Sequence, residues 1–542
     1  MALNTAHTDT FARDNLPPRD QWPELRFELP ELKYPHRLNC ASELLDAAIS
    51  EGCAERVAIY SDAGNLTYLQ LQEMSARIAN VLRHEQGVVP GNRVLLRGFN
   101  CTMLCAAWFA VMKAGAIAVT TMPMLRAKEL GEIAAKGLID HVICDARLIA
   151  EVSSAAEHTG FLKHVITWGD GALETAMRRQ ACAFENVDTS AEDVCLLAFT
   201  SGTTGNPKAT MHFHRDVLAM CDTVARHLLE TRDDDIYVGS PPLGFTFGLG
   251  ALLVFPLRFR GAAVMVEQPS PRTLLEAVQR YRATCLFTAP TMYKNLAGLV
   301  SEYDISTLRK SVSAGEMLPR ATSDAWHAAT GIRLIDGLGA TEMIHIFISA
   351  KGEAIRPGAT GKPLPGYEAV ILDESGLELP RGQAGRLAVR GPTGCRYLAD
   401  PRQTDYVING WNVTGDRYRV DEDGYFWFEA RADDMIISSG YNIGGPEVEA
   451  VLISHPAVKE VAVIGAPDEY RGEIVKAFIV LEAGYVAGPE LTKILQDHVK
   501  LNVAPYKYPR AIEYVVSLPK GATGKVLRYV LRKQARAGMS DG

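Results

Sequence analysis

The sequence lacks several features that mark other classes of protein. Lys and Arg number 56 against 64 Asp and Glu in 542 residues, so the basic excess of a nucleic-acid-binding protein is missing. The ten cysteines include no Cys-x-x-Cys pair and the polar segment 1–19 has no apolar export signal, which together indicate a reducing cytoplasm and no zinc site. The longest apolar run, 101–125, contains Lys113, Gly115 and Pro123 and therefore predicts buried structure and no membrane span.

Two common phosphate-binding fingerprints are also missing. A Walker loop needs four residues between its first glycine and a Gly-Lys-Ser/Thr ending, and a dinucleotide-binding fold needs Gly-x-Gly-x-x-Gly. Residues 200–208 instead read Thr-Ser-Gly-Thr-Thr-Gly-Asn-Pro-Lys, directly after the apolar, strand-like run 193–199. Its glycines let the backbone approach a ligand, and its hydroxyl groups and Lys208 bind oxyanions, so the stretch predicts a phosphate cradle of a third design.

Alternation of short strand-like runs with helical stretches from about 57 to 355 predicts α/β subdomains with mostly parallel sheets. Ligands of such sheets bind at the carboxyl ends of strands, where we expect 200–208, 313–316 and 336–342. From about 358 to 430, strand-like runs joined by turns predict a small antiparallel β-barrel or sheet. After Arg431 the pattern changes again, to that of a small α+β unit.

We therefore expect a large N-terminal domain over 1–431 and a small, mobile C-terminal domain over 432–542. The large domain would contain two α/β subdomains to about 357 and the β-barrel subdomain over about 358–430. Four further motifs belong to this organisation, and each is weak alone: 336–342 (Asp-Gly-Leu-Gly-Ala-Thr-Glu), 414–416 (Thr-Gly-Asp, expected in a turn), 431–434 (Arg-Ala-Asp-Asp) and 519–525 (Pro-Lys-Gly-Ala-Thr-Gly-Lys). In the first of them, a hydroxyl beside a carboxylate suits Mg²⁺ and phosphate.

Together and in this order, the motifs resemble the adenylate-forming superfamily of acyl- and aryl-CoA synthetases, amino-acid adenylation domains and beetle luciferases, from about residue 40 to 530. The resemblance implies ATP, Mg²⁺ and CoA as ligands. It implies that the β- and γ-phosphates of ATP are held by Thr200, Ser201, Gly202, Thr203, Thr204, Gly205 and Lys208. It also implies that the α-phosphate and Mg²⁺ are bound by Thr341 and Glu342, the latter as metal ligand.

The same resemblance assigns the rest of the nucleotide site. Gly315, Glu316 and Asp336 would flank adenine, and Asp416 and Arg431 would bind the ribose hydroxyls. Lys525 would bridge the substrate carboxylate and the α-phosphate, while Asp433 would be the hinge of the small domain. Two positions depart from the family pattern: Leu338 stands where an aromatic residue often stacks on adenine, and Ala209 stands where glycine often follows the lysine.

A narrower resemblance, to benzoate and 2-aminobenzoate CoA ligases, is carried by 245–250, 288–293, 312–316, 337–347, 394–397 and 439–443. It implies an acid pocket lined by Phe247, Ala314, Leu338 and His345, although core packing for Phe247 and a structural role for His345 are equally open. We expect an AMP-forming aryl-CoA ligase, with 2-aminobenzoate favoured over benzoate by the overall likeness, including 31–35. A site that accepts a hydrogen bond from the ortho amine would reject benzoate, but the residues do not identify that acceptor.

Other functions stay open at this point. An adenylation enzyme that loads a carrier protein, a luciferase-like oxygenase and a non-catalytic nucleotide sensor would share the nucleotide motifs. No carrier domain follows the last motif, which favours free CoA. His212 and His214 are too few for a metal site and are expected to be structural, and the oligomeric state is open, with a homodimer as one option.

Overall fold

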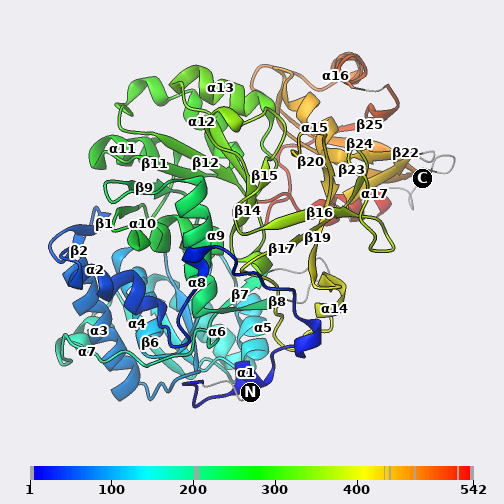
Figure 1. Cartoon of the computed structure of the whole chain (residues 1–542). Helices are drawn as coiled ribbons and strands as arrows, with labels where there is room; N and C mark the ends of the chain where they lie inside the picture. The colour runs from blue at the N-terminus through cyan, green and yellow to red at the C-terminus, as the bar shows by residue number, and fades with distance from the viewer. Residues whose placement is uncertain are drawn as a thin grey trace.

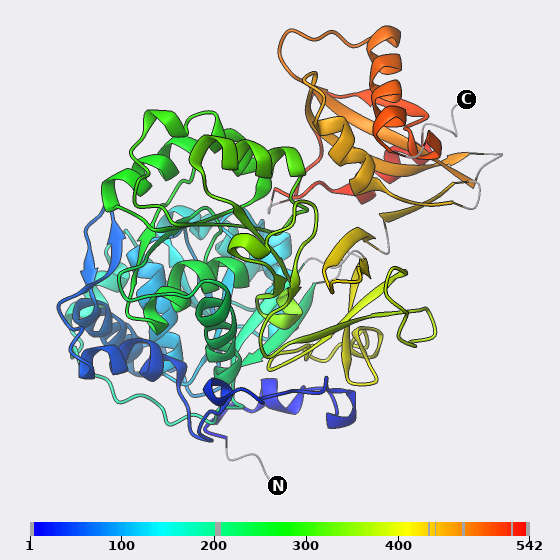
Figure 2. The same cartoon turned by 45° about the horizontal axis from the view of Figure 1, so that its top comes forward.

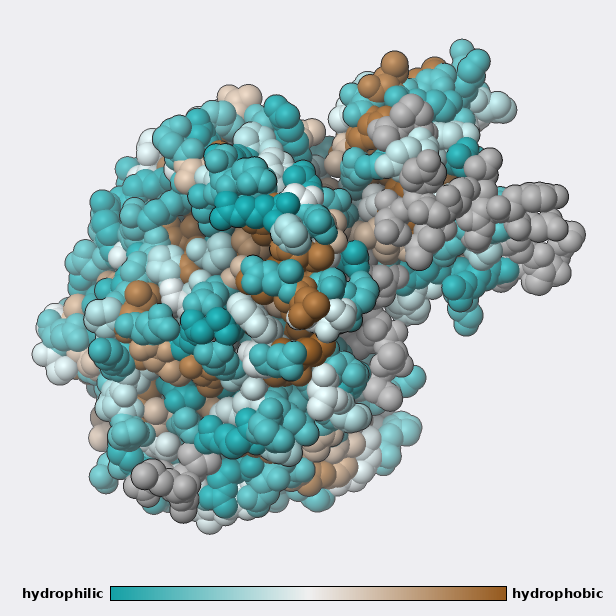
Figure 3. Space-filling model, turned by 45° about the vertical axis from the view of Figure 1, so that its right-hand side comes forward, coloured by the Kyte–Doolittle hydropathy of each residue, from teal (hydrophilic) through white to brown (hydrophobic). Residues whose placement is uncertain are grey.

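The computed structural model describes residues 5–200, 207–431, 434–438, 441–468, 472–503, 505–521 and 524–537. An α/β body carries a sheet subdomain on one side, and the C-terminal part forms a separate lobe (Figures 1 and 2). The face in Figure 3 is mostly hydrophilic, with hydrophobic side chains gathered in patches on the body. The expected fold class, a large α/β domain followed by a smaller α+β domain, is confirmed. Among the described helices, none has the length and apolar character needed to cross a bilayer.

A six-stranded sheet carries the phosphate-loop strands at one edge. Its order is β6 (His164–Trp168), β5 (His141–Asp145), β3 (Arg93–Arg97), β4 (Ile117–Thr121), β7 (Val194–Thr200) and β8 (Lys208–Phe213). All neighbours are parallel except β7 and β8, which pair antiparallel with Thr200 opposite Lys208. The buried helix α4 (Thr102–Lys113) occupies about half of the longest apolar run, whose composition predicted buried structure.

Helix boundaries in the body follow from local sequence. The helix α3 (Tyr68–His84) begins at Thr67, whose hydroxyl accepts from the Gln70 amide at 3.2 Å while the Gln70 side chain accepts from the Thr67 amide at 2.9 Å. This reciprocal capping satisfies two amide groups that the first helical turn leaves unpaired. The helices α11 (Pro271–Tyr281) and α12 (Pro290–Ala297) each start at a proline, which needs no amide partner there.

A nine-stranded sheet holds the second set of expected ligand loops. Its order is β15 (Lys362–Pro363), β14 (Ile346–Ser349), β13 (Leu334–Gly339), β12 (Lys310–Ala314), β11 (Cys285–Thr288), β9 (Ile236–Gly239), β10 (Ala262–Met265), β1 (Val57–Ser61) and β2 (Leu66–Thr67). Asp336 was expected in a loop after a strand ending at Ile335, but β13 continues to Gly339. The cause is pairing with β14, which places Leu338 opposite Ile348.

The expected antiparallel unit is a five-stranded sheet of β16 (Glu368–Leu372), β17 (Ala384–Arg390), β18 (Val407–Ile408), β19 (Trp411–Val420) and β20 (Phe426–Arg431). Asp416 was expected in a turn and instead lies inside β19. The pairing of β19 with β17 shifts register between Arg386 and Ala388, so a β-bulge replaces the expected turn. The N-terminal segment adds to this sheet, since the amide of Arg26 donates to the Gly391 carbonyl at 2.9 Å.

The C-terminal lobe has its own sheet and hydrophobic clusters. The sheet contains β22 (Tyr441–Gly444), β21 (Met435–Ser438), β24 (Gly472–Leu481), β23 (Val458–Asp468) and β25 (Ala511–Tyr514), and the helices are α15 (Gly445–Ile453), α16 (Pro489–Asn502) and α17 (Arg528–Ala537). Contact with the body includes Lys294, whose ammonium lies 3.3 Å from the Lys459 carbonyl and 3.8 Å from the Glu482 carboxylate. The exact boundary at 431/432 stays a prediction.

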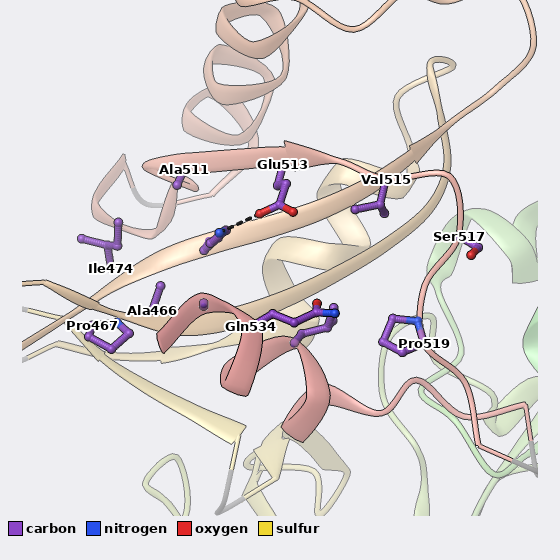
Figure 4. A pocket seen from close by; sticks show the side chains of 12 residues that line it. Ala466, Pro467, Ile474, Ala511, Glu513, Val515, Ser517, Pro519 and Gln534 are labelled. Carbon is purple, nitrogen blue, oxygen red and sulfur yellow. Dashed lines mark ion pairs between the residues drawn. The ribbon is translucent and has the colours of Figure 1, made fainter. Parts of the chain in front are cut away.

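A cavity of about 760 Å³ opens on this lobe beside β23, β24, β25 and α17 (Figure 4). Lys476 and Glu513 form an ion pair of 2.8 Å on its wall. All of its lining residues lie between 466 and 535. The cavity therefore belongs to the small domain alone and includes none of the residues expected to handle the nucleotide.

Candidate active site

The two ends of the phosphate loop lie side by side on the β7–β8 hairpin. Thr200 ends β7 and Lys208 begins β8, and the two residues are paired in register. Ser201, Gly202, Thr203, Thr204 and Gly205 lie outside the described residues, so their expected role stays a prediction. The half-buried Lys208 ammonium donates to the Tyr397 hydroxyl at 3.3 Å and lies 5.2 Å from the centre of the Tyr397 ring.

Tyr397 joins Lys208 to the expected magnesium ligand. Its hydroxyl donates to Oε1 of Glu342 at 2.6 Å, and its side chain is 1% exposed. Burial, and then the Glu342 charge, raise the pKa of Tyr397 far above its ordinary value, so the phenol stays protonated and donates. The sequence alone assigns Tyr397 no role beyond its place in the likeness over 394–397. Its two partners lie 189 and 55 positions away, so its contacts leave no local signal.

Thr341 and Glu342 form the short 3-10 turn η8 (Thr341–Met343) directly after β13. The Thr341 carbonyl accepts from Nε2 of His212 at 2.8 Å. Burial lowers the pKa of His212 to about 4, so the ring is neutral and this bond fixes its proton on Nε2. Ile344, the next residue after the turn, has a φ of 66°, which is strained for a β-branched side chain and persists where neighbouring contacts hold the segment.

The donor set at Thr341 and Glu342 fits magnesium. Mg²⁺ prefers one or two carboxylates and leaves its other positions to water and substrate phosphate oxygens. Here a partly buried carboxylate stands beside a threonine hydroxyl at the carboxyl end of a strand, with Lys208 linked to the same carboxylate. A hard oxygen site of this kind matches magnesium better than a thiophilic metal.

A different cluster, fully buried, is formed by Cys40, Cys195 and His214, whose ligand atoms lie within 4.8 Å of one another. Nδ1 of His214 already accepts from the Cys40 amide at 3.2 Å. Its Nδ1 lone pair therefore serves the backbone, and the structural role expected of His214 stays a prediction. Within the described part of the chain, no second cluster of this composition occurs.

The residues expected around adenine lie on the adjacent parallel strands β12 and β13, Gly315 and Glu316 just after the end of β12 and Asp336 within β13. Asp336 is opposite Ser313 in the β12–β13 pair. Gly315 has a φ of 90°, a conformation that suits glycine where the chain turns out of the strand. Desolvation raises the pKa of Asp336 to about 7, although a bond from the Gly337 amide opposes the shift. Glu316 accepts from the Thr291 hydroxyl at 3.3 Å.

The two expected ribose ligands are brought together by backbone pairing, since Asp416 on β19 is opposite Arg431 on β20. The side chain of Arg431 and all of Asp433 lie outside the described residues. The hinge and the ribose contact of the arginine therefore stay predictions.

The expected acid pocket is an aromatic cluster around His345. The His345 ring centre lies 5.5 Å from that of Phe247, in α9 (Thr246–Leu249), and 4.5 Å from that of Phe255. His345 is 3% exposed, and burial lowers its pKa to about 3. Its Nε2 lies 3.3 Å from the Phe247 carbonyl and must donate, so Nδ1 carries the lone pair. Nδ1 is buried and has no hydrogen-bond partner among the described residues.

The two other expected pocket residues stand beside this cluster on neighbouring strands. Ala314 ends β12 and is buried, while Leu338 in β13 is partly buried. Gly337 is opposite Ala314 in the β12–β13 pair and directly precedes Leu338. A side chain at Gly337 would place its Cβ 2.4 Å from Cδ1 of Ile346. Glycine therefore allows β13 to pack closely on the chain that carries His345.

Lys525 is exposed and precedes α17 in the small domain. Its carbonyl accepts from the Gly521 amide at 2.8 Å, which closes the loop. Arg528 follows three residues later; burial alone would lower its pKa, but the carboxylates of Glu449, Asp434 and Glu316 raise it above the ordinary value. Because Glu316 belongs to the large domain, Arg528 of the small domain is close enough to interact with a charge beside the predicted adenine strands.

Comparison with known proteins places these features in a family. The model of the AMP-binding enzyme family matches residues 45–397, and that of its C-terminal domain matches 447–525. The chain is 34% identical to the benzoate–CoA ligase of Thauera aromatica over 93% of this chain and 97% of that protein. The crystal structure of the anthranilate CoA ligase AuaEII in complex with anthranoyl-AMP superposes with a TM-score of 0.90 at 33% identity, covering 94% of this chain and 100% of that one. A benzoate CoA ligase from Burkholderia xenovorans LB400 gives a TM-score of 0.84 at 31% identity, covering 91% and 100%.

Proposed function

We propose that this chain, which belongs to the AMP-binding enzyme family, is an ATP-dependent aryl-CoA ligase that activates 2-aminobenzoate as its acyl-AMP and transfers the acyl group to CoA. Aryl-CoA ligase activity and the use of ATP and CoA are supported at the level of the family and its relatives. The observation that carries the proposal is that Lys208 and Glu342 both bind the Tyr397 hydroxyl, together with an aromatic cluster whose buried His345 imidazole has an acceptor without a partner among the described residues.

The first half-reaction brings two anions together. The substrate carboxylate attacks the α-phosphorus of ATP, the bond to pyrophosphate breaks, and negative charge grows on the phosphate oxygens. Lys208 and the loop from Thr200 to Gly205 would hold the β- and γ-phosphates, and Lys525 would bring a positive charge between the carboxylate and the α-phosphate. Thr341 and Glu342 would hold Mg²⁺, which when bound supplies charge neutralisation on the phosphates.

The nucleotide would be oriented by the residues at the strand ends. Gly315, Glu316 and Asp336 would contact adenine, and Asp416 with Arg431 would bind the ribose hydroxyls. Asp433 would be the hinge on which the small domain rotates. In the second half-reaction the CoA thiol attacks the acyl carbon, the bond to AMP breaks, and the thioester forms, so Lys525 is no longer needed at the phosphate.

His345 supports 2-aminobenzoate over benzoate. Because its Nε2 proton is directed to the Phe247 carbonyl, Nδ1 is left as a buried acceptor without a partner. A buried polar atom without a hydrogen bond is costly, so a ligand amine that donates to it is favoured. Benzoate would leave the same atom unpaired, which is the basis for discrimination between the two acids.

The test is AMP release from ATP, Mg²⁺ and CoA with 2-aminobenzoate, benzoate and other substituted benzoates, for the wild type and His345→Leu. We expect 2-aminobenzoate to rank first, and the substitution to reduce its advantage over benzoate about tenfold, as for one hydrogen bond. An unchanged ranking in His345→Leu would remove His345 as the acceptor. Thioester formation without light would separate the ligase from a luciferase-like oxygenase, and turnover with free CoA would separate it from a carrier-loading enzyme.

A further inference from the structure

The Thr341–Glu342 pair is contacted by His212 on one face of β8 and by Tyr397, which is bridged to the same face. Side chains alternate along a strand, so Lys208, Thr210 and His212 share a face. Tyr397 forms an antiparallel bridge with Thr210, which brings its side chain to the same face. His212 donates to the Thr341 carbonyl at 2.8 Å, and Tyr397 donates to the Glu342 carboxylate at 2.6 Å.

The segment that carries Tyr397 is also held in place by backbone hydrogen bonds to β8 and by a buried ion pair. The Met211 amide donates to the Arg396 carbonyl at 2.8 Å, and the Leu398 amide donates to the Ala209 carbonyl at 2.9 Å. The fully buried Arg396 guanidinium pairs with the fully buried Asp216 carboxylate and lies 4.0 Å from the centre of the Phe213 ring. Removing one member of a buried pair is strongly destabilising, so this anchor resists displacement of the segment.

The residue that follows the turn of this pair has a strained backbone conformation. Ile344 follows η8 with a φ of 66°, and the cost of that conformation is met by contacts around it. His212 fixes the main chain of the pair, while Tyr397 fixes its side chain.

We propose that His212 and Tyr397 are positioning residues for the adenylation step, because together they hold Thr341 and Glu342 against β8 at a fixed separation from Lys208. The inference rests on the proposed ligase function and concerns residues that the nucleotide motifs do not include. Its consequence is specific: loss of either contact loosens the oxygen ligands that would hold Mg²⁺, without altering the aromatic pocket or Lys525.

Tyr397→Phe removes one hydroxyl and leaves the ring. We expect adenylation, followed by acid-dependent pyrophosphate exchange, to slow about 10- to 100-fold, as for one hydrogen bond to a charged group. The half-saturating Mg²⁺ concentration and the Kd of MgATP, the latter from calorimetry, should both rise about threefold or more. Conversion of supplied aryl-adenylate and CoA to thioester should fall clearly less than adenylation, because that step keeps the α-phosphate contact but has no pyrophosphate group left to neutralise.

His212 offers a graded pair of variants. His212→Leu removes the donor to Thr341 and should show the same signature as Tyr397→Phe. His212→Gln places an amide donor near the position of Nε2 and should recover most of the lost rate and Mg²⁺ affinity.

Thr210→Val is the matched control. Thr210 lies between Lys208 and His212 on the same face, is fully buried, and its hydroxyl has no partner within the described part of the chain. This isosteric change should leave rate, Mg²⁺ dependence and MgATP affinity within about twofold, because it removes no hydrogen bond.

The proposal would be contradicted by wild-type Mg²⁺ dependence in both Tyr397→Phe and His212→Leu. Equal losses of rate in both half-reactions, or losses of the same size in Thr210→Val, would also contradict it. A lower melting temperature with unchanged MgATP affinity would show a purely structural role and would also overturn it. Failure of the wild type to form AMP from any aryl acid would instead remove the proposed function, so the two failures are distinguishable.

Discussion

The cations expected to act on ATP come from two regions that differ in how they are held. In the large domain, Lys208 is half-buried and linked through Tyr397 to Glu342, while His212 holds the adjacent Thr341 carbonyl. In the small domain, Lys525 is exposed on a loop closed by a bond from the Gly521 amide to its own carbonyl. A site fixed before the substrate arrives lowers the reorganisation needed in the transition state, whereas a charge delivered by a second domain can be withdrawn between steps.

The comparison predicts its largest effect at Lys525. Lys525→Ala should reduce acid-dependent pyrophosphate exchange about 10²–10³-fold, as for loss of one group that stabilises the transition state. Conversion of supplied aryl-adenylate and CoA to thioester should be nearly unchanged. Equal loss of both half-reactions would show that Lys525 is not specific to the adenylation step.

The next effect concerns the hinge. Asp433→Pro restricts the backbone where rotation is expected and should slow thioester formation about tenfold or more, with a smaller loss in adenylation. Asp434 belongs to a described ion pair with Arg532, so Asp434→Asn serves as a control for local destabilisation. A wild-type thioester rate in Asp433→Pro would remove Asp433 as the hinge.

Asp336 extends the comparison of the two regions because it lies in β13 of the large domain, where the site is formed before the substrate binds. Its pKa of about 7 in the folded protein lies above the ordinary value of 3.8, so between these values the folded state holds a proton that the unfolded state has released. Stability therefore falls as pH rises through this window, by about 2 kcal/mol between pH 5 and 7. Urea unfolding of Asp336→Asn at both pH values should show the smaller decline, and an equal decline in wild type and variant would contradict the assignment.

The smallest effect has the opposite sign and comes from the buried histidines. His345 and His212 have folded pKa values of about 3 and about 4, below the ordinary 6.5, so the unfolded chain binds protons first as pH falls. Each should cost about 1 kcal/mol of stability between pH 6.5 and 5.5. His345→Leu should remove its share of this loss in urea unfolding. The same slope in His345→Leu and wild type would contradict a neutral buried His345.

Much of the fold follows from local pattern, and the exceptions have physical causes. The alternation of strands and helices expected from about 57 to 355 is present, for example in β1, α3, β3, α4 and β11, because the patterns behind it extend over a few residues. The extension of β13 through Asp336 depends on pairing with β14, and the bulge at Asp416 depends on registers with β17 and β20. Neither is visible within the segment itself.

The same distinction applies to the site. The strand ends at Thr200 and Lys208, the strand-end position of Gly315 and Glu316, and the turn at Thr341 were expected from motifs and lie where ligands of such sheets bind. Tyr397 and His212 could not be assigned from sequence, because their roles arise from a bridge between residues 210 and 397 and a contact between residues 212 and 341. The unpaired Nδ1 of His345 likewise becomes visible only when the Phe247 carbonyl is in place.

The central claim is that the protein makes an aryl-adenylate before it makes a thioester. A single-turnover reaction of enzyme with ATP, Mg²⁺ and 2-aminobenzoate, without CoA, measures this directly as pyrophosphate released per active site. The proposed mechanism predicts about one equivalent of pyrophosphate, followed on addition of CoA by equal amounts of AMP and aryl-CoA. No pyrophosphate before CoA is added, and no AMP from any aryl acid afterwards, would contradict it.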